Sequence, residues 1–302
     1  MAIYVNTNVS SLHGRRSLNN VQNSLTTTYQ RLSSGLRINS AKDDAAGLQI
    51  ADRLTTQING LNQGNRNTND GIAFAQTVEG ALDETTNMLQ KIRTLAVQAA
   101  NGTNTLEDRT ALKKEADSLS AEITRIAKQT KFGGKTILMG NTKSAIYFSG
   151  GNGNAQNGSK GGKITLQVGA NKGDQIAFDV GNFMFSAMAK GVKDKAWAET
   201  AKGFLFSTVS GAKDTIDLMD NLIAKVDAQR SDLGAIQNRL ESSIRNQANV
   251  AANQADARSR IRDADFAEES ANLSQQSIIQ QAATSMLMQA NTRVQLALSL
   301  IG

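Results

Sequence analysis

Apolar residues recur at alternating spacings of three and four in four stretches of the chain, a pattern that keeps one stripe of a helix against a partner helix. The longest stripe runs from Ile216 to Ile244, and its continuation through an alanine-rich stretch to about Arg260 predicts a helix of roughly 45 residues, on the order of 70 Å long. Helices in globular proteins average about a dozen residues. The chain is therefore expected to form long paired helices.

The other three stripes are shorter and are separated by turn residues. They comprise Leu18, Val21, Leu25 and Leu32 with Tyr29 and Leu36 beside them, Ala75 to Ala99 with Thr85 as the one position that is not apolar, and Leu112 to Ile126. The turn at residues 101–104 separates the second stripe from the third, and Asn104 or Thr105 can cap the helix that follows. Phe132-Gly133-Gly134 is expected to end the third helix.

The composition agrees with packed helices and excludes several kinds of site. The 302 residues include no proline, so no helix kink is imposed, and no cysteine, which excludes disulfides and thiolate metal sites. The single histidine, His13, would have to carry any imidazole-based centre alone. Because aromatic residues make up only 4%, the core must consist mainly of Leu, Ile, Val and Ala, as in helix bundles.

The middle of the chain differs from both ends. Residues 150–162 include six glycines, a composition too flexible for a packed element. Two short runs that alternate apolar and polar residues around a turn predict a β-hairpin at about 163–180. The apolar positions of these runs are Ile164, Leu166, Val168, Ile176, Phe178 and Val180. Residues 181–205 contain the only tryptophan and show no clear period, so no element is assigned to them.

Positive charge is concentrated in the same middle region. The formal net charge of the chain is +6, but residues 128–213 alone carry +8, from twelve lysines, no arginine and four acidic residues. Specific recognition of nucleic acid favours arginine, and single strands need interleaved aromatic side chains. The lysines are therefore interpreted as a solvated outer face, and no nucleic-acid partner is expected.

No grouping of residues has the pattern of a catalytic or metal site. Lys42-Asp43-Asp44 and Asp263-Ala264-Asp265 bring carboxylates together, but such pairs near helix starts usually interact with the helix dipole. The glycine cluster lacks the GK[ST] sequence of a phosphate loop, and no HExxH occurs. We expect no enzyme activity, no metal and no cofactor.

The C-terminal segment, residues 271–301, is helix-prone and contains one charged residue, Arg293, among several Leu, Ile and Met. It can pack on the first helix as an ordinary helical hairpin. Alternatively, both terminal segments are held unfolded or bound by a chaperone and bury their apolar residues only between subunits, which the abundance of Gln, Asn and Ser favours. No window of about 18 residues is free of polar residues, so no membrane span is expected. The N-terminal residues lack the pattern of a secretory signal. By this criterion alone, the expected location of the protein is the cytoplasm.

Five long strings of the chain resemble bacterial flagellin. They are Ile3–Asn8, Leu32–Leu48, LQKIRTLAVQAAN at residues 89–101, Gln129–Gly134 and Ile261–Glu268. The resemblance covers roughly residues 1–140 and 207–302, together with the hairpin around Val168–Asn171.

This resemblance implies a mainly α fold: a long antiparallel coiled-coil rod formed by the N- and C-terminal segments, with a small β-hairpin and an irregular region in the middle. Residues 1–43 with 262–302 would form an inner terminal domain, and residues 44–180 with 206–261 a rod domain outside it. Residues 141–162 and 181–205 would be short variable insertions at the outer surface. Glycines 47, 60, 64 and 71 are expected to let the subunit adjust between two packings.

The resemblance also implies the function, a subunit that polymerises with itself into the extracellular flagellar filament. Export would proceed through the flagellar type III apparatus, which replaces the cytoplasmic default. The partners would be hook-associated junction and cap proteins and an export chaperone at the C-terminal segment. The expected subunit contacts are Leu18, Val21, Leu25, Leu32, Leu36, Ile278, Ile279, Met286, Leu287, Leu296, Leu298 and Leu300.

Residues similar to those that Toll-like receptor 5 engages in this family are Lys91, Leu95 and Glu115, with Gln90 and Arg93 adjacent to them. The usual arginine is lysine at position 91, which keeps the charge but loses the planar guanidinium, so weaker recognition is expected. Three other classes remain as alternatives. A hook–filament junction protein would lack the string at 89–101, a secretion-needle component would lack RINSAKDDAAG, and an enzyme or nucleic-acid binder would need a constellation of residues that is absent here.

Overall fold

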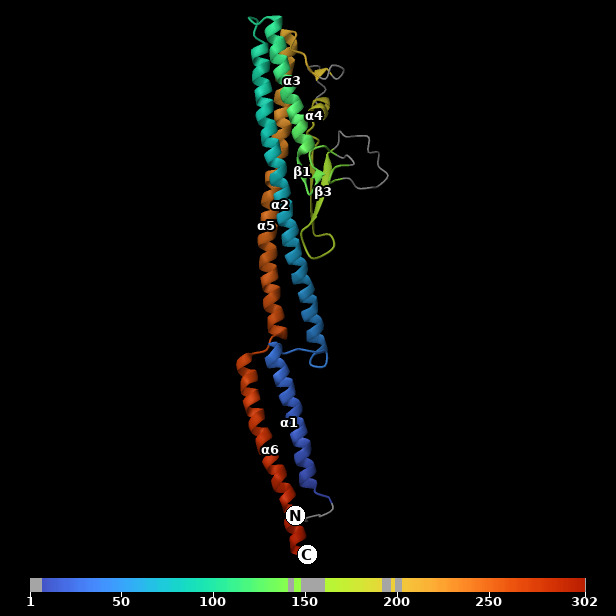
Figure 1. Ribbon diagram of the computed structural model, residues 1–302, viewed down its shortest axis with the longest axis vertical. Helices are drawn as coiled ribbons and strands as arrows, with labels where there is room; N and C mark the ends of the chain where they lie inside the picture. Colours follow the sequence, from blue (N-terminus) through green and yellow to red (C-terminus); the bar gives the residue numbers. More distant parts are fainter. Residues whose placement is uncertain (1–6, 141–143, 148–160, 192–196, 199–202, 302) are drawn as a thin grey trace, which may run out of the picture. The chain divides into compact units, whose positions relative to one another are not determined.

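The computed structural model describes residues 7–140, 144–147, 161–191, 197–198 and 203–301 (Figure 1). The glycine-rich stretch at 148–160 lies outside these residues. Contacts divide the chain into two compact units, Met1–Asn59 with Val250–Gly302 (unit 1) and Gly60–Asn249 (unit 2). Helices α2 (Ala45–Ala99, 55 residues) and α5 (Val209–Arg262, 54 residues) each contribute to both units.

The core of unit 2 lies among α2, α3 (Leu106–Gln129) and α5, as the apolar stripes predicted. Every position of the stripe from Ala75 to Ala99 is at most 2% exposed. Its one polar member, Thr85, donates its hydroxyl to the carbonyl of Ala81 at 2.8 Å, so its burial leaves no hydroxyl unpaired. The long helix predicted from Ile216 is confirmed, and it begins a little earlier, at Val209.

A capping box starts α3 at Thr105, one of the two residues that the sequence offered for this role. The Thr105 hydroxyl accepts a hydrogen bond from the Asp108 amide at 3.2 Å, and the Asp108 carboxylate accepts one from the Thr105 amide at 3.0 Å. The hydrogen bonds from Thr105 hold the pKa of Asp108 below its ordinary value, because they favour the charged carboxylate.

Replacing Thr105 by alanine should lower the free energy of unfolding by about 1 kcal/mol, the usual cost of losing a helix cap. The Asp108 carboxylate should add its stabilisation fully above the pKa of an unfolded aspartate, about 3.9, and lose it as the pH falls through the lower folded value. Urea titrations of Thr105→Ala and of Thr103→Ala at several pH values measure the loss of the cap and its pH dependence. Thr103 is an exposed threonine in the turn before α3. Equal stability of the two variants at neutral pH contradicts the capping role.

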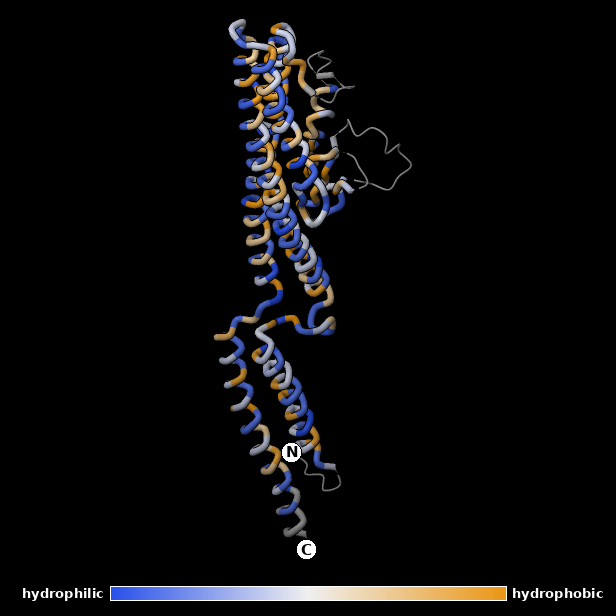
Figure 2. Tube along the Cα trace, turned by 45° about the horizontal axis from the view of Figure 1, so that its top comes forward, coloured by the Kyte–Doolittle hydropathy of each residue, from blue (hydrophilic) through white to orange (hydrophobic). Residues whose placement is uncertain are grey.

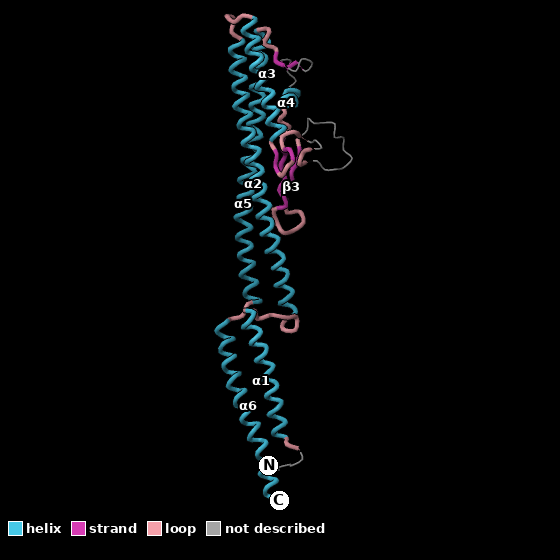
Figure 3. The backbone as a smooth tube through the Cα atoms, in the orientation of Figure 1, coloured by secondary structure: helices cyan, strands magenta, loops and turns pink. Residues whose placement is uncertain are grey.

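The predicted β-hairpin is confirmed as β3 (Gly162–Gln167) paired antiparallel with β4 (Gln175–Val180) (Figure 3). Ile164 faces Phe178 in the register. The Asp174 carbonyl closes the turn by accepting from the amides of Val168 and Gly169 at 2.9 and 3.2 Å. A second hairpin, β1 (Lys131–Phe132) with β2 (Lys135–Thr136), follows α3 at the two glycines where the sequence predicted only a helix end.

The described part of residues 181–205, for which the sequence indicated no element, contributes to the core of unit 2. It forms α4 (Phe185–Gly191), β5 (Trp197–Ala198) and β6 (Gly203–Phe204). Four aromatic side chains in and beside it are at most 2% exposed: Phe183, Phe185, Phe204 and Phe206. The Asp117 carboxylate on α3 accepts a hydrogen bond from the Phe204 amide at 3.1 Å. This segment therefore covers the side of α3.

Candidate assembly interface

Unit 1 contains an antiparallel pair of terminal helices, α1 (Val9–Ser34) and α6 (Phe266–Ile301). Near one end the Asn8 side-chain amide donates to the carbonyl of Ala290 at 2.9 Å. At the other end Arg31 forms an ion pair with Glu269 at 3.1 Å. The terminal segments thus pack on each other, as the fold class predicted.

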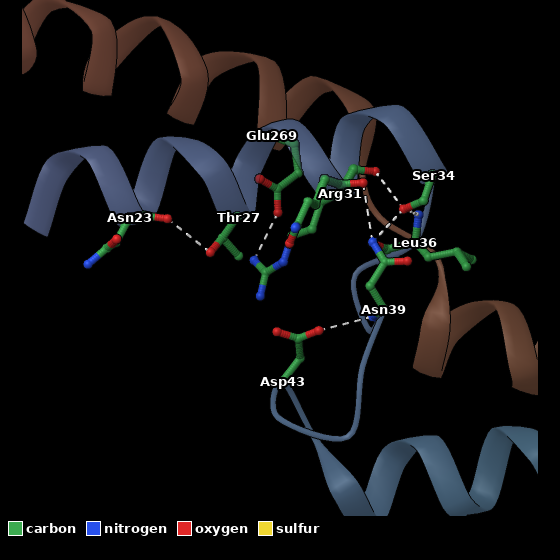
Figure 4. A network of polar contacts seen from close by, with 9 residues as sticks. Asn23, Thr27, Arg31, Ser34, Leu36, Asn39, Asp43 and Glu269 are labelled. Atoms are coloured by element: carbon green, nitrogen blue, oxygen red, sulfur yellow. Dashed lines mark hydrogen bonds and ion pairs between the residues drawn. The ribbon is translucent and has the colours of Figure 1, made fainter.

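A polar network surrounds the end of α1 (Figure 4). The Asn39 side-chain amide donates to the carbonyl of Gln30 and to the hydroxyl of Ser34, at 3.2 and 2.7 Å. The Asp43 carboxylate accepts from the amides of Asn39 and Ser40. The hydrogen bonds from Ser40 hold the pKa of Asp43 below its ordinary value, because they stabilise the ionised form. The network thus links the connection between α1 and α2 to the last turns of α1.

Main-chain hydrogen bonds join the same connection to the segment between α5 and α6. The Arg37 amide donates to the carbonyl of Arg262 at 2.7 Å, and the Ala264 amide donates to the carbonyl of Gly35 at 3.0 Å. The two strings that resemble flagellin in this region, Leu32–Leu48 and Ile261–Glu268, therefore meet in the fold.

One carboxylate of each pair acts at a helix start, as predicted from its position. Asp44 accepts from the Gly47 amide at 2.9 Å, and Asp265 accepts from the Ala267 amide at 2.8 Å. His13 is exposed on α1. Within the described ranges, no three His, Asp or Glu side chains gather into a possible metal site. Nor does any helix there combine the length and apolar character that crossing a membrane requires.

The twelve predicted subunit contacts differ widely in exposure. Leu25 is buried at 6% exposed. Five others are half-buried: Leu18, Val21, Leu32, Leu36 and Leu287. Ile278, Ile279 and Met286 are 66%, 41% and 70% exposed. Leu296, Leu298 and Leu300 lie in α6, but their side chains are not among those that the structure describes.

Exposed apolar side chains are concentrated in unit 1, while the apolar core lies in unit 2. Figure 2 colours the residues along the helices of both units by their hydropathy. Nine of the thirteen large apolar side chains described as exposed belong to unit 1: Val9, Leu12, Tyr29, Ile50, Phe266, Ile278, Ile279, Met286 and Met288. Among the described side chains of α6, the single buried one is Glu269. An isolated subunit thus leaves much of the apolar surface of α6 in water.

The five residues compared with a receptor site lie on α2 and α3. Gln90, Lys91 and Glu115 are exposed, and the Lys91 ammonium lies 3.6 Å from the Glu115 carboxylate. Arg93 is half-buried and donates to Asp220 on α5 at 2.6 Å. Leu95 is only 7% exposed and belongs to the core of unit 2. Its side chain therefore packs in the core, under the surface that contains the exposed residues.

Two family models match the chain, the bacterial flagellin N-terminal helical region over residues 5–143 and the bacterial flagellin C-terminal helical region over residues 216–301. The chain is 36% identical to flagellin D of Vibrio anguillarum over 377 aligned positions and 36% identical to flagellin B of Vibrio cholerae over 376, and each alignment covers all of both chains. A solved structure assigned as a flagellar hook-associated protein of Vibrio parahaemolyticus shares the fold, with a TM-score of 0.54 and 14% identity, over 73% of this chain and 100% of that one. The chain therefore belongs to the bacterial flagellin family, whose members are structural proteins of the extracellular flagellar filament and not enzymes.

Proposed function

We propose that neighbouring copies of this filament subunit cover the exposed apolar side chains of α1 and α6, so that the terminal helices complete their packing only in the polymer. The observation that carries the proposal is the contrast between the two units. In unit 1 the buried apolar side chains are Leu25, Ile38, Ala51 and Ile58 among those described, whereas nine large ones are exposed. Monomeric proteins seldom leave such a set in water.

The energetics agree with assembly as the step that stabilises these helices. Burying one Leu, Ile or Met side chain contributes roughly 1.5–3 kcal/mol. Ile278, Ile279, Met286 and Met288 on α6 alone supply four such side chains. Ordering the helices costs conformational entropy, as for other segments that fold on binding. The burial gained from several subunits can offset this cost, whereas the α1–α6 pair alone buries little.

The variant Ile278→Ser tests this proposal in the full-length chain. Ile278 is 66% exposed, so the substitution should leave the isolated subunit folded, but it removes roughly 1.5–3 kcal/mol of burial in the polymer. The extent of seeded polymerisation should therefore fall by at least about tenfold. Sedimentation and electron microscopy measure this extent.

Leu106→Ser is the matched control, since Leu106 is 58% exposed at the start of α3 in unit 2. It should polymerise like the unaltered chain. Normal polymerisation of Ile278→Ser would refute the assembly role of α6.

Membership of the flagellin family supports a specific route out of the cell. In this proposal the subunit is exported through the flagellar type III apparatus, and an export chaperone binds the C-terminal segment until the subunit is added to the filament. Junction and cap proteins of the hook-associated class are the partners at the filament ends. Residues 1–43 with 262–302 form the innermost domain of the filament, and residues 44–180 with 206–261 form the rod domain outside it.

Toll-like receptor 5 is the proposed host partner of the surface that contains Gln90, Lys91 and Glu115. These exposed side chains on adjacent helices give a receptor both charged and polar contacts. Because Leu95 is buried, Leu95→Ala would weaken the core as well as the surface. Substitutions at Lys91 are a cleaner test.

Lys91→Arg should strengthen signalling in receptor reporter cells about three- to tenfold, because a guanidinium can form one more charge-assisted hydrogen bond worth about 1 kcal/mol. Lys114→Arg, at an exposed lysine on α3, is the control and should leave the potency unchanged. An unchanged potency of Lys91→Arg would count against recognition at this position.

A further inference from the structure

The sulfur chemistry of the chain is carried by methionine alone, because there is no cysteine among the 302 residues. In unit 2, Met88, Met139 and Met184 are half-buried, and Met188 and Met219 are fully buried. On α6, Met286 and Met288 are 70% and 66% exposed. The two most accessible thioethers that the structure describes thus lie two residues apart on one terminal helix.

Their positions place them on both sides of the contact between α1 and α6. Leu287, the residue between them, faces α1, where its Cδ1 lies 3.1 Å from the position that a Cβ on Gly14 would occupy. Successive helical residues are about 100° apart around the axis. Met286 and Met288 therefore flank the seam between the two helices and point away from it, toward the faces that neighbouring copies cover in the proposed polymer.

Exposure governs how readily a thioether is oxidised by peroxide. The sulfur lone pair attacks one oxygen of hydrogen peroxide, so that an S–O bond forms and the O–O bond breaks. The transferred oxygen gives its proton to the departing hydroxide, which leaves as water. Sulfur is oxidised by two electrons and the peroxide is reduced by two. The product, methionine sulfoxide, is polar and accepts hydrogen bonds where the thioether was apolar.

We propose that Met286 and Met288 form a peroxide-sensitive modification site that decides whether a free subunit can be incorporated. This inference rests on the proposed assembly role of α6. Sulfoxide oxygens on these residues would enter an apolar contact without partners, which is costly. Oxidation therefore blocks polymerisation of the free subunit, whereas subunits already in the filament are protected because their thioethers are covered.

The test treats the full-length subunit with hydrogen peroxide and locates the added oxygen by peptide mass spectrometry before seeded polymerisation. Met286 and Met288 should be oxidised before the five methionines of unit 2. The extent of polymerisation should fall about tenfold relative to the untreated subunit, a factor equivalent to about 1.4 kcal/mol. Methionine sulfoxide reductase should restore it. In assembled filaments the same two residues should be oxidised much more slowly.

The double variant Met286→Leu/Met288→Leu removes both thioethers and keeps apolar side chains of similar size. Each protein is compared with its own untreated sample, so any effect of the substitutions on assembly cancels. The double variant should lose its sensitivity to peroxide, and Met88→Leu, a substitution at a half-buried position of unit 2, should keep it.

Three results would overturn the inference: normal polymerisation of subunits oxidised at both sites, persistent inhibition in the double variant, or equal oxidation rates in subunit and filament. A failure of the assembly proposal itself would appear without peroxide, as normal polymerisation of Ile278→Ser.

Discussion

Replacing Gly64 by alanine should displace the β3–β4 hairpin from α2 and lower the free energy of unfolding by about 3 kcal/mol, as strong overpacking does. A Cβ at this position would lie 2.0 Å from the carbonyl oxygen of Val168 and 2.8 Å from its carbonyl carbon. Both atoms belong to the backbone, so no side-chain rotation can relieve the overlap. Gly60 and Gly71 make similarly close approaches, to Ala170 and Leu166 of the same hairpin region.

Gly80→Ala provides the matched control on the same helix. Gly80 is exposed, and a Cβ there would meet no atom within 4 Å. Because alanine favours the helix more than glycine does, this variant should gain about 0.5–1 kcal/mol. Urea unfolding followed by circular dichroism measures both changes, and tryptophan fluorescence gives an independent signal. If the two substitutions shift the stability in the same direction, the close contact at Gly64 does not exist in solution.

Truncating the core of unit 2 should have a second large effect, and the same truncation in unit 1 should have almost none. Leu82 is fully buried, so Leu82→Ala should lower the free energy of unfolding by about 2–5 kcal/mol through lost burial and a residual cavity. Leu12 on α1 is 54% exposed, and Leu12→Ala should change the stability of the dilute subunit by no more than about 0.5 kcal/mol.

Chemical unfolding of the two leucine variants at low protein concentration measures this difference. A large loss of stability for Leu12→Ala in the dilute subunit would mean that α1 is already well packed without neighbours.

The helices of unit 2 were predictable because their periodicity is local. Every repeat position from Ala75 to Ala99 is buried, since α2 presents one regular stripe to its partners. The first stripe was less informative. Tyr29, grouped with that stripe, is 56% exposed, while Thr28 is 5% exposed. In a helix that buries few residues, the position of the partner helix decides which face is covered. The sequence of α1 alone does not specify where that partner helix lies.

The aromatic cluster around α4 and β6 could not be predicted from local patterns. Phe183, Phe185, Phe204 and Phe206 are close in space but separated in sequence, and tertiary contacts rather than a period bring them together. The glycines of α2 are a similar case. The sequence indicated conformational adjustment at Gly60, Gly64 and Gly71, which stays a prediction. The structure shows instead that another segment lies close to each of these glycines. Such contacts depend on the partner segment, which a single helix sequence does not reveal.

The candidate assembly residues show both the strength and the limit of sequence reasoning. The apolar character of α6 indicated Ile278, Ile279 and Met286, and all three are exposed in the isolated subunit. Six other large side chains of unit 1 are also exposed and were not among the predicted contacts: Val9, Leu12, Tyr29, Ile50, Phe266 and Met288. Their large apolar or aromatic side chains were the available signal. Which of them meets a neighbouring copy depends on the symmetry of the filament, and the chain does not encode that symmetry locally.

Amide hydrogen exchange of α6, in the dilute subunit and in the assembled filament, tests the central claim most directly. Few buried apolar contacts mean a low free energy of local opening. Amides of residues 270–295 should therefore exchange rapidly in the subunit, while those of residues 75–99 remain protected, and both sets should be protected in the filament. If residues 270–295 of the dilute subunit are as well protected as residues 75–99, the terminal helices are already complete without their neighbours, contrary to this account.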